Sequence, residues 1–313
     1  MEIATDTAVV MATHDGQAFL QPQLESILAQ TLLPAVLTIV DDGSRDETRA
    51  IVREFSDRAP FRVELLPLVG TPGVDPRIRI ARAMSLGLTS VAGHAFILLA
   101  DQDDEWLPGR LAGQRSLLHS GSDIQLVAGD GVLIDATGTE VGGTLRDRFP
   151  VPDGWATMSA AARVAAAIRQ PFVTGATCAL RADLVPLLTP VPAGWHIDRW
   201  ATLVAAARGS LEVQLEAVIR YRVHAGQTTG LGGAAIGRGQ QRWRQVLGRG
   251  ATILDAARRS RDVVNRIRPL AIDPGVRREL SWPAIVRGAF DRSAPDPSRS
   301  EGVDDGRIEW RGL

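Results

Sequence analysis

One run of six residues constrains the fold more than any other feature of the chain. Residues 95–100 read Ala-Phe-Ile-Leu-Leu-Ala and are apolar throughout. A strand with one face in water alternates between apolar and polar residues, whereas a strand covered on both faces does not. The run is also far shorter than the roughly 20 residues that a membrane-spanning helix needs. We therefore predict a central strand, buried on both faces, in a parallel sheet.

Short β-type runs and helical stretches alternate on either side of this strand. In the helical stretch over residues 77–91, for example, the apolar residues Ile80, Met84 and Leu88 recur every fourth residue. This order predicts an α/β fold, a mostly parallel sheet flanked by helices. Residues 159–222 continue the same pattern. Further strands are expected at residues 7–12, 36–40, 61–66 and 125–134.

Acidic residues follow three of the expected strands, at the point where each strand ends. The first strand leads into Thr-His-Asp-Gly at 13–16, the second into Asp-Asp-Gly-Ser at 41–44, and the apolar strand into Asp-Gln-Asp-Asp at 101–104. The carboxyl ends of parallel strands meet at one edge of a sheet, and ligands bind there. The sequence therefore predicts a ligand site that these three loops share.

The loop after the apolar strand has the composition of a divalent-cation site. Asp101, Asp103, Asp104 and Glu105 are four acidic residues within five positions, so their charges repel one another. Mg²⁺ and Mn²⁺ prefer carboxylate and phosphate oxygens, and either ion would relieve the repulsion. The alternative is a solvated loop in which Asp104 or Glu105 caps a helix that starts near Pro108.

Six segments occur in an order that is more specific than any one of them. In this order they resemble the family 2 glycosyltransferases with a GT-A fold, and among these the bacterial rhamnosyltransferase-like group. The resemblance covers about residues 7–230. The segments are Ala-Thr-His-Asp-Gly (12–16), Gln-Leu-Glu-Ser-Ile-Leu-Ala-Gln-Thr (23–31), Val-Asp-Asp-Gly-Ser-Arg-Asp (40–46), Leu-Ala-Asp-Gln-Asp-Asp-Glu-Trp-Leu-Pro (99–108), Val-Thr-Gly-Ala-Thr (173–177) and Tyr-Arg-Val-His (221–224).

The resemblance implies a donor pocket at the first two loops. Thr13 and its neighbours His14 and Asp15 form the loop that receives the nucleotide. Asp42 is similar to the residue that hydrogen-bonds the base, with Asp41 beside it. The family usually has an aromatic residue and Asn where this chain has His14 and Asp15, so stacking on the base is expected to differ or to involve His14.

The resemblance also implies the diphosphate and acceptor ends of the site. Asp101 and Asp103 resemble the metal and donor ligands, with Asp103 in direct contact with Mg²⁺ or Mn²⁺, and His224 resembles a residue near the diphosphate. Asp198 resembles the general base, although Ile197 separates it from His196 whereas the family often has His directly before Asp. From the residues alone, Asp198 also fits a helix N-terminal carboxylate, and His224 a strand-end histidine.

The implied function is that of an inverting glycosyltransferase of hexosyltransferase type. It would move a sugar from a nucleotide-diphosphate donor to a hydroxyl of a saccharide or lipid-linked acceptor, in surface polysaccharide or glycolipid synthesis. One alternative is a nucleotidyltransferase-like enzyme, which usually has a Gly-rich phosphate loop with a basic residue after the first strand. Another is a non-catalytic nucleotide-sugar binding module, which would lose Asp103 or Asp198. A dinucleotide-dependent oxidoreductase is excluded, because no Gly-x-Gly-x-x-Gly follows the first strand.

The C-terminal part differs in composition from the rest. We expect a GT-A catalytic domain over 1–230, an Arg-rich helical extension over 231–290 and a disordered tail over 291–313. Residues 238–268 carry nine Arg against two Asp. This segment either packs an apolar helix face on the catalytic domain or lies on an anionic membrane surface.

The composition of the chain limits which partners and which cellular compartment we expect. The net charge is −1 and no base-reading motif is visible, so nucleic acid is not expected as a partner. The single cysteine excludes a disulfide framework. The N-terminus lacks the pattern of a signal peptide. We expect a cytoplasmic protein. If its acceptor is linked to a lipid, we expect peripheral contact with the inner face of the plasma membrane.

Overall fold

The computed structural model describes residues 2–68, 73–121, 123–192, 195–227 and 261–283. Its strands are β1 (Glu2–Thr13), β2 (Leu32–Asp41), β3 (Arg62–Pro67), β4 (Phe96–Ala100), β5 (Glu105–Trp106), β6 (Leu126–Ile134), β7 (Glu140–Thr144), β8 (Cys178–Arg181) and β9 (Leu211–Arg222). Its α-helices are α1 (Leu20–Leu28), α2 (Thr48–Arg58), α3 (Pro76–Ser90), α4 (Arg110–Ser120), α5 (Leu145–Arg148), α6 (Ala160–Arg169), α7 (Val185–Leu188), α8 (Ile197–Arg208) and α11 (Pro274–Glu279). Short 3₁₀ turns are η1 (Trp155–Thr157), η2 (Gly175–Thr177), η3 (Ala182–Leu184) and η4 (Arg268–Leu270).

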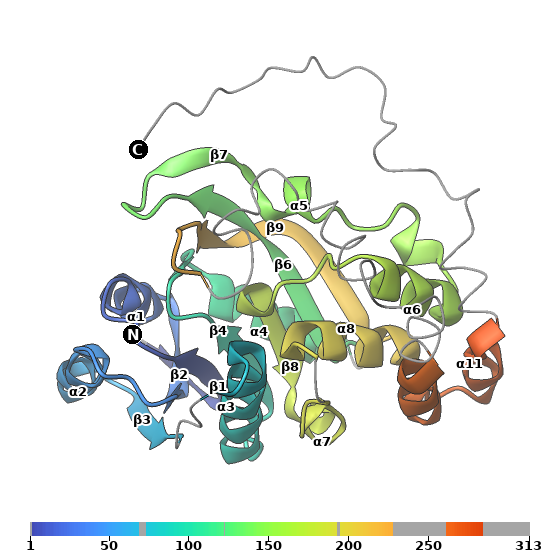
Figure 1. The fold of residues 1–313 in the computed structure, drawn as a ribbon, viewed down its shortest axis with the longest axis horizontal. Helices are drawn as coiled ribbons and strands as arrows, with labels where there is room; N and C mark the ends of the chain where they lie inside the picture. Colours follow the sequence, from blue (N-terminus) through green and yellow to red (C-terminus); the bar gives the residue numbers. More distant parts are fainter. Residues whose placement is uncertain (1, 69–72, 122, 193–194, 228–260, 284–313) are drawn as a thin grey trace.

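The described strands form one nine-stranded sheet (Figure 1). Its order is β3-β2-β1-β4-β8-β6-β9-β5, and β7 pairs with β6 outside this path. Strands β3, β2, β1 and β4 are parallel, whereas β8 runs antiparallel to β4 and to β6. The predicted α/β fold with flanking helices is confirmed. Parallel pairing holds for the four N-terminal strands, and the sheet as a whole is mixed.

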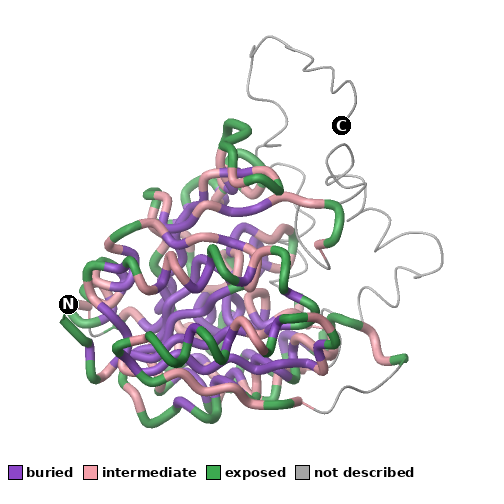
Figure 2. Tube along the Cα trace, turned by 90° about the vertical axis from the view of Figure 1, so that its left-hand side faces the viewer, coloured by how far each residue is buried: buried purple, intermediate pink, exposed green. Residues whose placement is uncertain are grey.

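Both faces of the sheet are covered by helices. Successive side chains of a strand point to opposite faces, so in β1 Ala8 and Val10 join a core with helices α3, α6, α7 and α8. Val9 and Met11 join the opposite core, with α1, α2 and α4. Every residue of β4 is buried, as its apolar run predicts. In Figure 2 the buried stretches of the chain run through the interior.

The register of the strands brings the three acidic loops to one edge. Thr13, the last residue of β1, lies opposite Asp41, the last residue of β2. Ala100 at the end of β4 lies opposite Met11, two residues before the end of β1. All three loops therefore begin at the same level of the sheet, as predicted.

The described part of the Arg-rich segment packs on the domain. Residues 261–267 are helical, and Val263, Val264 and Ile267 are buried in the core that contains α6 and α8. The packing interpretation is confirmed for these residues. Residues 238–260 and the tail 291–313 lie outside the described residues, so the predicted domain boundaries remain predictions. No helix in the described ranges is both long and apolar enough to cross a bilayer.

Candidate functional site

The loop after β4 holds three carboxylates close together. One oxygen each of Asp101, Asp103 and Asp104 lies within 4.8 Å of the others. Asp101 is exposed, Asp103 is half-buried and Asp104 is buried. Asp104 Oδ1 accepts the N–H of Arg222 at 2.9 Å. Asp104 Oδ2 is buried and has no partner among the described residues. This oxygen-rich cluster, with an unpaired buried oxygen, fits the ligand preference of Mg²⁺ or Mn²⁺.

Burial and the charges of neighbouring carboxylates raise the pKa values of Asp104 and Asp101. Burial raises the pKa of Asp104 well above its usual range, and the charges of Asp103 and Asp101 add to the shift. The pKa of Asp101 is raised to about 7, by desolvation and then by the charges of Asp103 and Asp198. The exposed surface of Asp101 limits how much water it loses, so we attribute its shift mainly to the neighbouring carboxylates. A cation would favour the ionised forms of Asp101 and Asp104.

A buried arginine lies behind the acidic loop. Arg110 is 3% exposed and donates to the carbonyl of Leu99 at 2.9 Å. Its charge opposes the pKa rise of Asp101 and Asp104. Burial lowers the pKa of Arg110 to about 9, so the guanidinium stays protonated at neutral pH. One buried positive charge therefore faces a cluster of three carboxyl groups.

The end of β9 fixes the conformation of the acidic loop. Arg222 Nε donates to the carbonyl of Asp103 at 2.8 Å, and Arg222 Nη2 pairs with Glu105 at 2.5 Å. His224 Nε2 lies 2.9 Å from Asp103 Oδ2. The predicted diphosphate residue and the predicted metal ligand are thus in direct contact.

The alternative role of Asp104 and Glu105 as helix caps is wrong. Helix α4 begins at Arg110, and its N-cap is Gly109, at φ 81° and with no side-chain cap. Glu105 instead forms ion pairs with Arg220 and Arg222. The loop turns back to pair with β9 before the helix starts, which carries both acids away from the helix end.

The loop after β1 contacts both acidic loops. Thr13 Oγ1 donates to Gln102 Oε1 at 2.7 Å. His14 is exposed at the surface, and its Nδ1 lies 2.9 Å from the carbonyl of Asp42. Asp15 has a left-handed backbone (φ 45°), and its Oδ1 accepts the N–H of Arg45 at 2.8 Å. These contacts hold the predicted nucleotide loop between its two neighbours.

Two arginines neutralise the loop after β2. Arg49 Nε donates to Asp41 Oδ2, and Arg79 Nε to Asp42 Oδ2, each at 2.6 Å. Asp41 Oδ1 also accepts the N–H of Ser44 at 3.2 Å, so both of its oxygens are used. Asp42 Oδ1 is buried and has no partner among the described residues. Asp42 therefore keeps one carboxylate oxygen that could accept a hydrogen bond from a ligand, whereas both oxygens of Asp41 already bond to the protein.

Asp198 lies in the first turn of α8. Its Oδ1 accepts the N–H of Arg199 at 2.7 Å, and its Oδ2 that of Gly175 at 3.3 Å. Its charge raises the pKa of Asp101, so the two carboxylates lie within electrostatic range. His196 is the N-cap residue of α8 and makes no side-chain cap. The location of Asp198 is that of a helix N-terminal carboxylate, and the role of general base stays a prediction.

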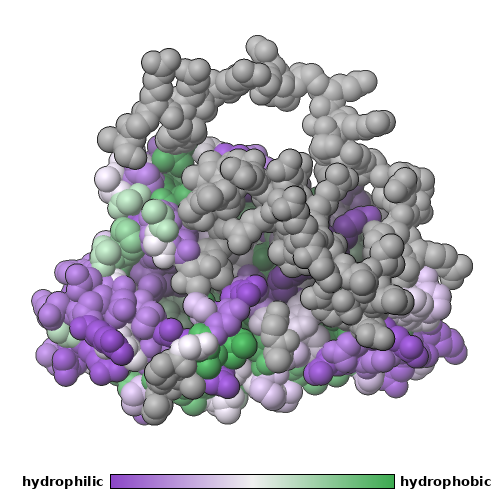
Figure 3. All heavy atoms as spheres, in the orientation of Figure 1, coloured by the Kyte–Doolittle hydropathy of each residue, from purple (hydrophilic) through white to green (hydrophobic). Residues whose placement is uncertain are grey.

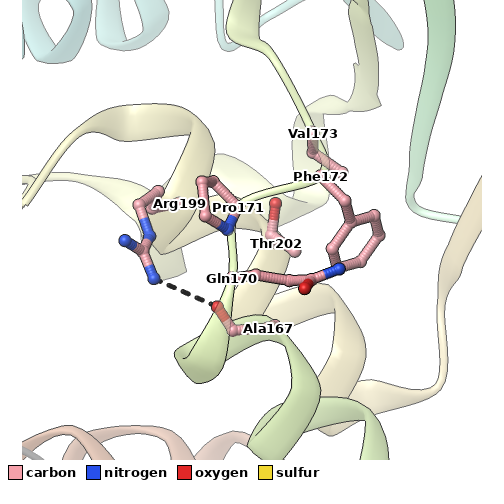
Figure 4. Close-up of a pocket in the computed structure, with 7 residues that line it drawn as sticks. All are labelled: Ala167, Gln170, Pro171, Phe172, Val173, Arg199 and Thr202. Carbon is pink, nitrogen blue, oxygen red and sulfur yellow. Dashed lines mark hydrogen bonds between the residues drawn. The ribbon is translucent and has the colours of Figure 1, made fainter. Parts of the chain in front are cut away.

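A small pocket lies between α8 and the C-terminal end of α6 (Figure 4). Arg199 and Thr202 line it from α8, and Arg199 Nη2 donates to the carbonyl of Ala167 at 3.2 Å. The other lining residues come from the end of α6 and the segment after it: Ala167, Gln170, Pro171, Phe172 and Val173.

Four side chains of the site have roles that sequence reasoning did not assign. Gln102 and Arg222 lie inside quoted motifs, but the sequence does not show which loop each contacts. Arg79 and Arg110 lie on helices and belong to no motif. Because the chain has many arginines, an arginine at one position is not a distinctive signal. Their partners are distant in sequence: Arg79 is 37 residues from Asp42, and Arg222 is 119 from Asp103.

A family model matches the N-terminal half of the domain. Residues 8–131 match the model of glycosyl transferase family 2. This range contains the loops after β1, β2 and β4, and it ends before Asp198 and His224.

Curated relatives match over the same region. The UDP-Glc:alpha-D-GlcNAc-diphosphoundecaprenol beta-1,3-glucosyltransferase WfgD of Escherichia coli is 31% identical over 111 residues, 36% of this chain and 40% of that protein. The dTDP-rhamnosyl transferase RfbG of Shigella flexneri is 30% identical over 103 residues, 32% of this chain and 34% of that protein. The chain thus spans less than half the length of these curated relatives.

Solved structures match over most of the chain. The structure of S. aureus TarS 1-349 in complex with UDP-GlcNAc superimposes with a TM-score of 0.57 at 15% identity, over 94% of this chain and 74% of that one. At this identity the likeness shows the fold alone, which is GT-A.

Proposed function

We propose that this chain transfers a sugar from a nucleoside-diphosphate donor to an acceptor hydroxyl with inversion. The premise is that the chain belongs to glycosyl transferase family 2 over residues 8–131. The observation that carries the proposal is the meeting of three unlike groups at one sheet edge. A neutralised loop has a free buried acceptor, Asp42 Oδ1. A negatively charged cluster surrounds Asp103. The third group, the carboxylate of Asp198, contributes to the raised pKa of Asp101.

The donor would lie across the loops after β1, β2 and β4. Asp42 Oδ1 would accept an N–H of the base, because a buried acceptor without a partner is costly unless a ligand satisfies it. Thr13, His14 and Asp15 would border the nucleoside, with Asp41 supporting the turn. Asp101, Asp103 and His224 would border the diphosphate.

Asp101 and Asp103 would hold the divalent cation, with Asp103 as the direct ligand. When bound, Mg²⁺ or Mn²⁺ would neutralise the charge that develops on the leaving nucleoside diphosphate. The buried Arg110 supplies only one positive charge behind the loop, so the cation would supply most of the positive charge that faces a diphosphate.

Asp198 would be the general base. Its two backbone N–H donors orient the carboxylate. An oxygen of Asp198 would take the proton as the acceptor oxygen forms its bond to the anomeric carbon. The bond from that carbon to the diphosphate oxygen breaks, and the nucleoside diphosphate leaves with the electron pair. Attack from the face opposite the leaving group inverts the anomeric configuration and needs no covalent sugar–enzyme intermediate.

The names of the relatives suggest the substrate classes. WfgD is named for a UDP-Glc donor and a diphosphoundecaprenol-linked acceptor, and RfbG for a dTDP-rhamnosyl donor. We propose a UDP- or dTDP-linked hexose as donor and a saccharide or lipid-linked acceptor in surface polysaccharide or glycolipid synthesis. The nucleotidyltransferase and binding-module alternatives are not favoured, because the matched family and the named relatives are glycosyltransferases.

Peripheral contact with an anionic membrane would suit such an acceptor. In Figure 3, hydrophilic side chains gather over the described C-terminal helices. Arg261, Arg266 and Arg278 are exposed there, as is Ile272 at 64%. Flotation with vesicles containing anionic lipid, but not with neutral vesicles, is the expected result. Absence of flotation with both would remove this part of the proposal.

A screen of nucleotide-sugars tests the main proposal. Wild type is expected to gain thermal stability from one class of nucleoside diphosphate sugar in the presence of Mn²⁺ or Mg²⁺, because a ligand that binds only the folded state stabilises it. Asp103→Ala is the matched control and should lose the gain. If no nucleotide-sugar or nucleoside diphosphate stabilises the wild type, the proposal fails.

A further inference from the structure

Gln102, the residue between Asp101 and Asp103, uses its carboxamide on the loop after β1. Its Oε1 accepts the hydroxyl of Thr13 at 2.7 Å and the N–H of His14 at 2.9 Å. Its Nε2 donates to the carbonyl of His14 at 3.2 Å. Both ends of one side chain in the acidic loop are thus bonded to the predicted nucleotide loop.

The two loops approach closely at Gly16. A Cβ at Gly16 would lie 2.5 Å from Gln102 Oε1 and 3.0 Å from Thr13 Oγ1. The 2.5 Å contact would force the carboxamide of Gln102 to shift, and this carboxamide is held by hydrogen bonds. The carboxamide therefore occupies the space that a side chain at Gly16 would need.

The hydrogen bonds continue from these loops to Asp42. The N–H of Asp42 donates to the carbonyl of Thr13 at 2.8 Å, and His14 Nδ1 lies 2.9 Å from the carbonyl of Asp42. Gln102 is thus the side-chain link in a continuous path from Asp103 to Asp42, the two carboxylates proposed for opposite ends of the donor.

We propose that Gln102 is a positioning residue that couples cation binding at the acidic loop to nucleoside binding at the loops after β1 and β2. This inference rests on the proposed function. A cation that orders the acidic loop also fixes, through Gln102, the loop that carries Thr13 and His14. The nucleoside then binds a preorganised loop and spends less free energy on ordering it. By linkage, the nucleotide tightens cation binding by the same factor.

The test is the factor by which Mn²⁺ tightens nucleoside-diphosphate binding. Calorimetric titrations of UDP, dTDP and GDP, each with Mn²⁺ and with EDTA, give this factor for the nucleotide that binds best. Gln102→Met keeps the side-chain length and removes the three bonds. It is expected to lower the factor about tenfold, within the range usual for coupled sites. Affinity in EDTA should change little at a temperature where the variant is folded.

Thr13 provides the matched variants from the other side of the contact. Thr13→Val removes the hydroxyl and should also lower the factor, whereas Thr13→Ser keeps the hydroxyl and should preserve it. A merely structural role would lower affinity equally with Mn²⁺ and with EDTA. An unchanged factor in Gln102→Met and Thr13→Val overturns this inference alone. A wild type that binds no nucleoside diphosphate overturns the proposed function and, with it, the coupling.

Discussion

The loops after β2 and β4 carry the same kind of side chain in opposite electrostatic surroundings. After β2, Asp41 and Asp42 each accept from an arginine at 2.6 Å. After β4, one oxygen each of three carboxylates lies within 4.8 Å of the others, and Asp103 contacts the imidazole of His224. The first loop is neutralised by the protein, and the second is not.

The difference shows that charge balance, and not the number of acids, separates a hydrogen-bonding loop from a cation-binding one. Both loops have consecutive aspartates at the end of a parallel strand. Only the second keeps a surplus of negative charge that an ion can neutralise. The first keeps a single free acceptor, Asp42 Oδ1, which suits a neutral N–H donor.

Asp198 lies outside both loops, so its replacement separates donor binding from proton transfer. Asp198→Asn removes the proton acceptor and keeps the side-chain size. We expect transfer to fall by about 10²–10⁴-fold, the usual contribution of a general base, while nucleoside-diphosphate affinity with Mn²⁺ changes by less than about twofold. Steady-state transfer assays and calorimetry measure the two quantities. Full transfer activity would reassign the base, and lost donor binding would place Asp198 in the donor site.

Asp42→Asn tests whether the neutralised loop binds the base. The free oxygen becomes part of an amide, so the bond to a base N–H weakens or is lost. We expect about tenfold or more weaker nucleoside-diphosphate binding, since a hydrogen bond to a charged group contributes about 1.5–3 kcal/mol. Calorimetry with Mn²⁺ and with EDTA should show the same loss in both.

Asp41→Asn is the matched control, because both oxygens of Asp41 already have protein partners. It should lower the melting temperature with little effect on nucleotide affinity at a temperature where it is folded. Equal losses of affinity in both variants would contradict the separate roles of the two residues.

Asp101→Asn tests the repulsion in the second loop and has the smallest expected effect. The folded-state pKa of Asp101 is raised from 3.8 to about 7, so the folded state holds this proton more tightly than the unfolded state. Stability of the metal-free protein should therefore fall as pH rises through that window. Asparagine does not ionise, so Asp101→Asn should not lose this stability as the pH rises.

In EDTA at pH 8, Asp101→Asn should have a higher melting temperature than wild type, and the difference should vanish near pH 4. Because Asp101 is exposed, we expect a shift of only about 2–4 °C, the usual effect of about 1 kcal/mol in a domain of this size. Asp42→Asn should melt lower than wild type at pH 8, since it leaves Arg79 without its ion pair. Destabilisation by both variants would mean that the second loop is also neutralised.

The sequence was sufficient for the fold and for the edge where the site lies. The apolar run at β4 and the acidic residues after β1, β2 and β4 predicted both, because strand ends and burial are local properties. The pairing of β8 and β6 was not predictable in this way, since antiparallel pairing in the second half depends on contacts between distant segments. The arginines that neutralise Asp41 and Asp42 were also beyond sequence reasoning, because many arginines are available and only packing selects the partner.

The most direct test is a titration of Mn²⁺, followed by the electron paramagnetic resonance of the free ion, with saturating UDP or dTDP. The wild type is expected to bind about one Mn²⁺ per chain. Asp103→Asn should weaken binding by more than the roughly 10–100-fold that loss of an outer partner of a metal site costs, whereas Asp42→Asn should leave it within about threefold once nucleotide is saturating. Wild-type affinity in Asp103→Asn, or equal loss in both variants, would contradict the assignment of the cation to the loop after β4.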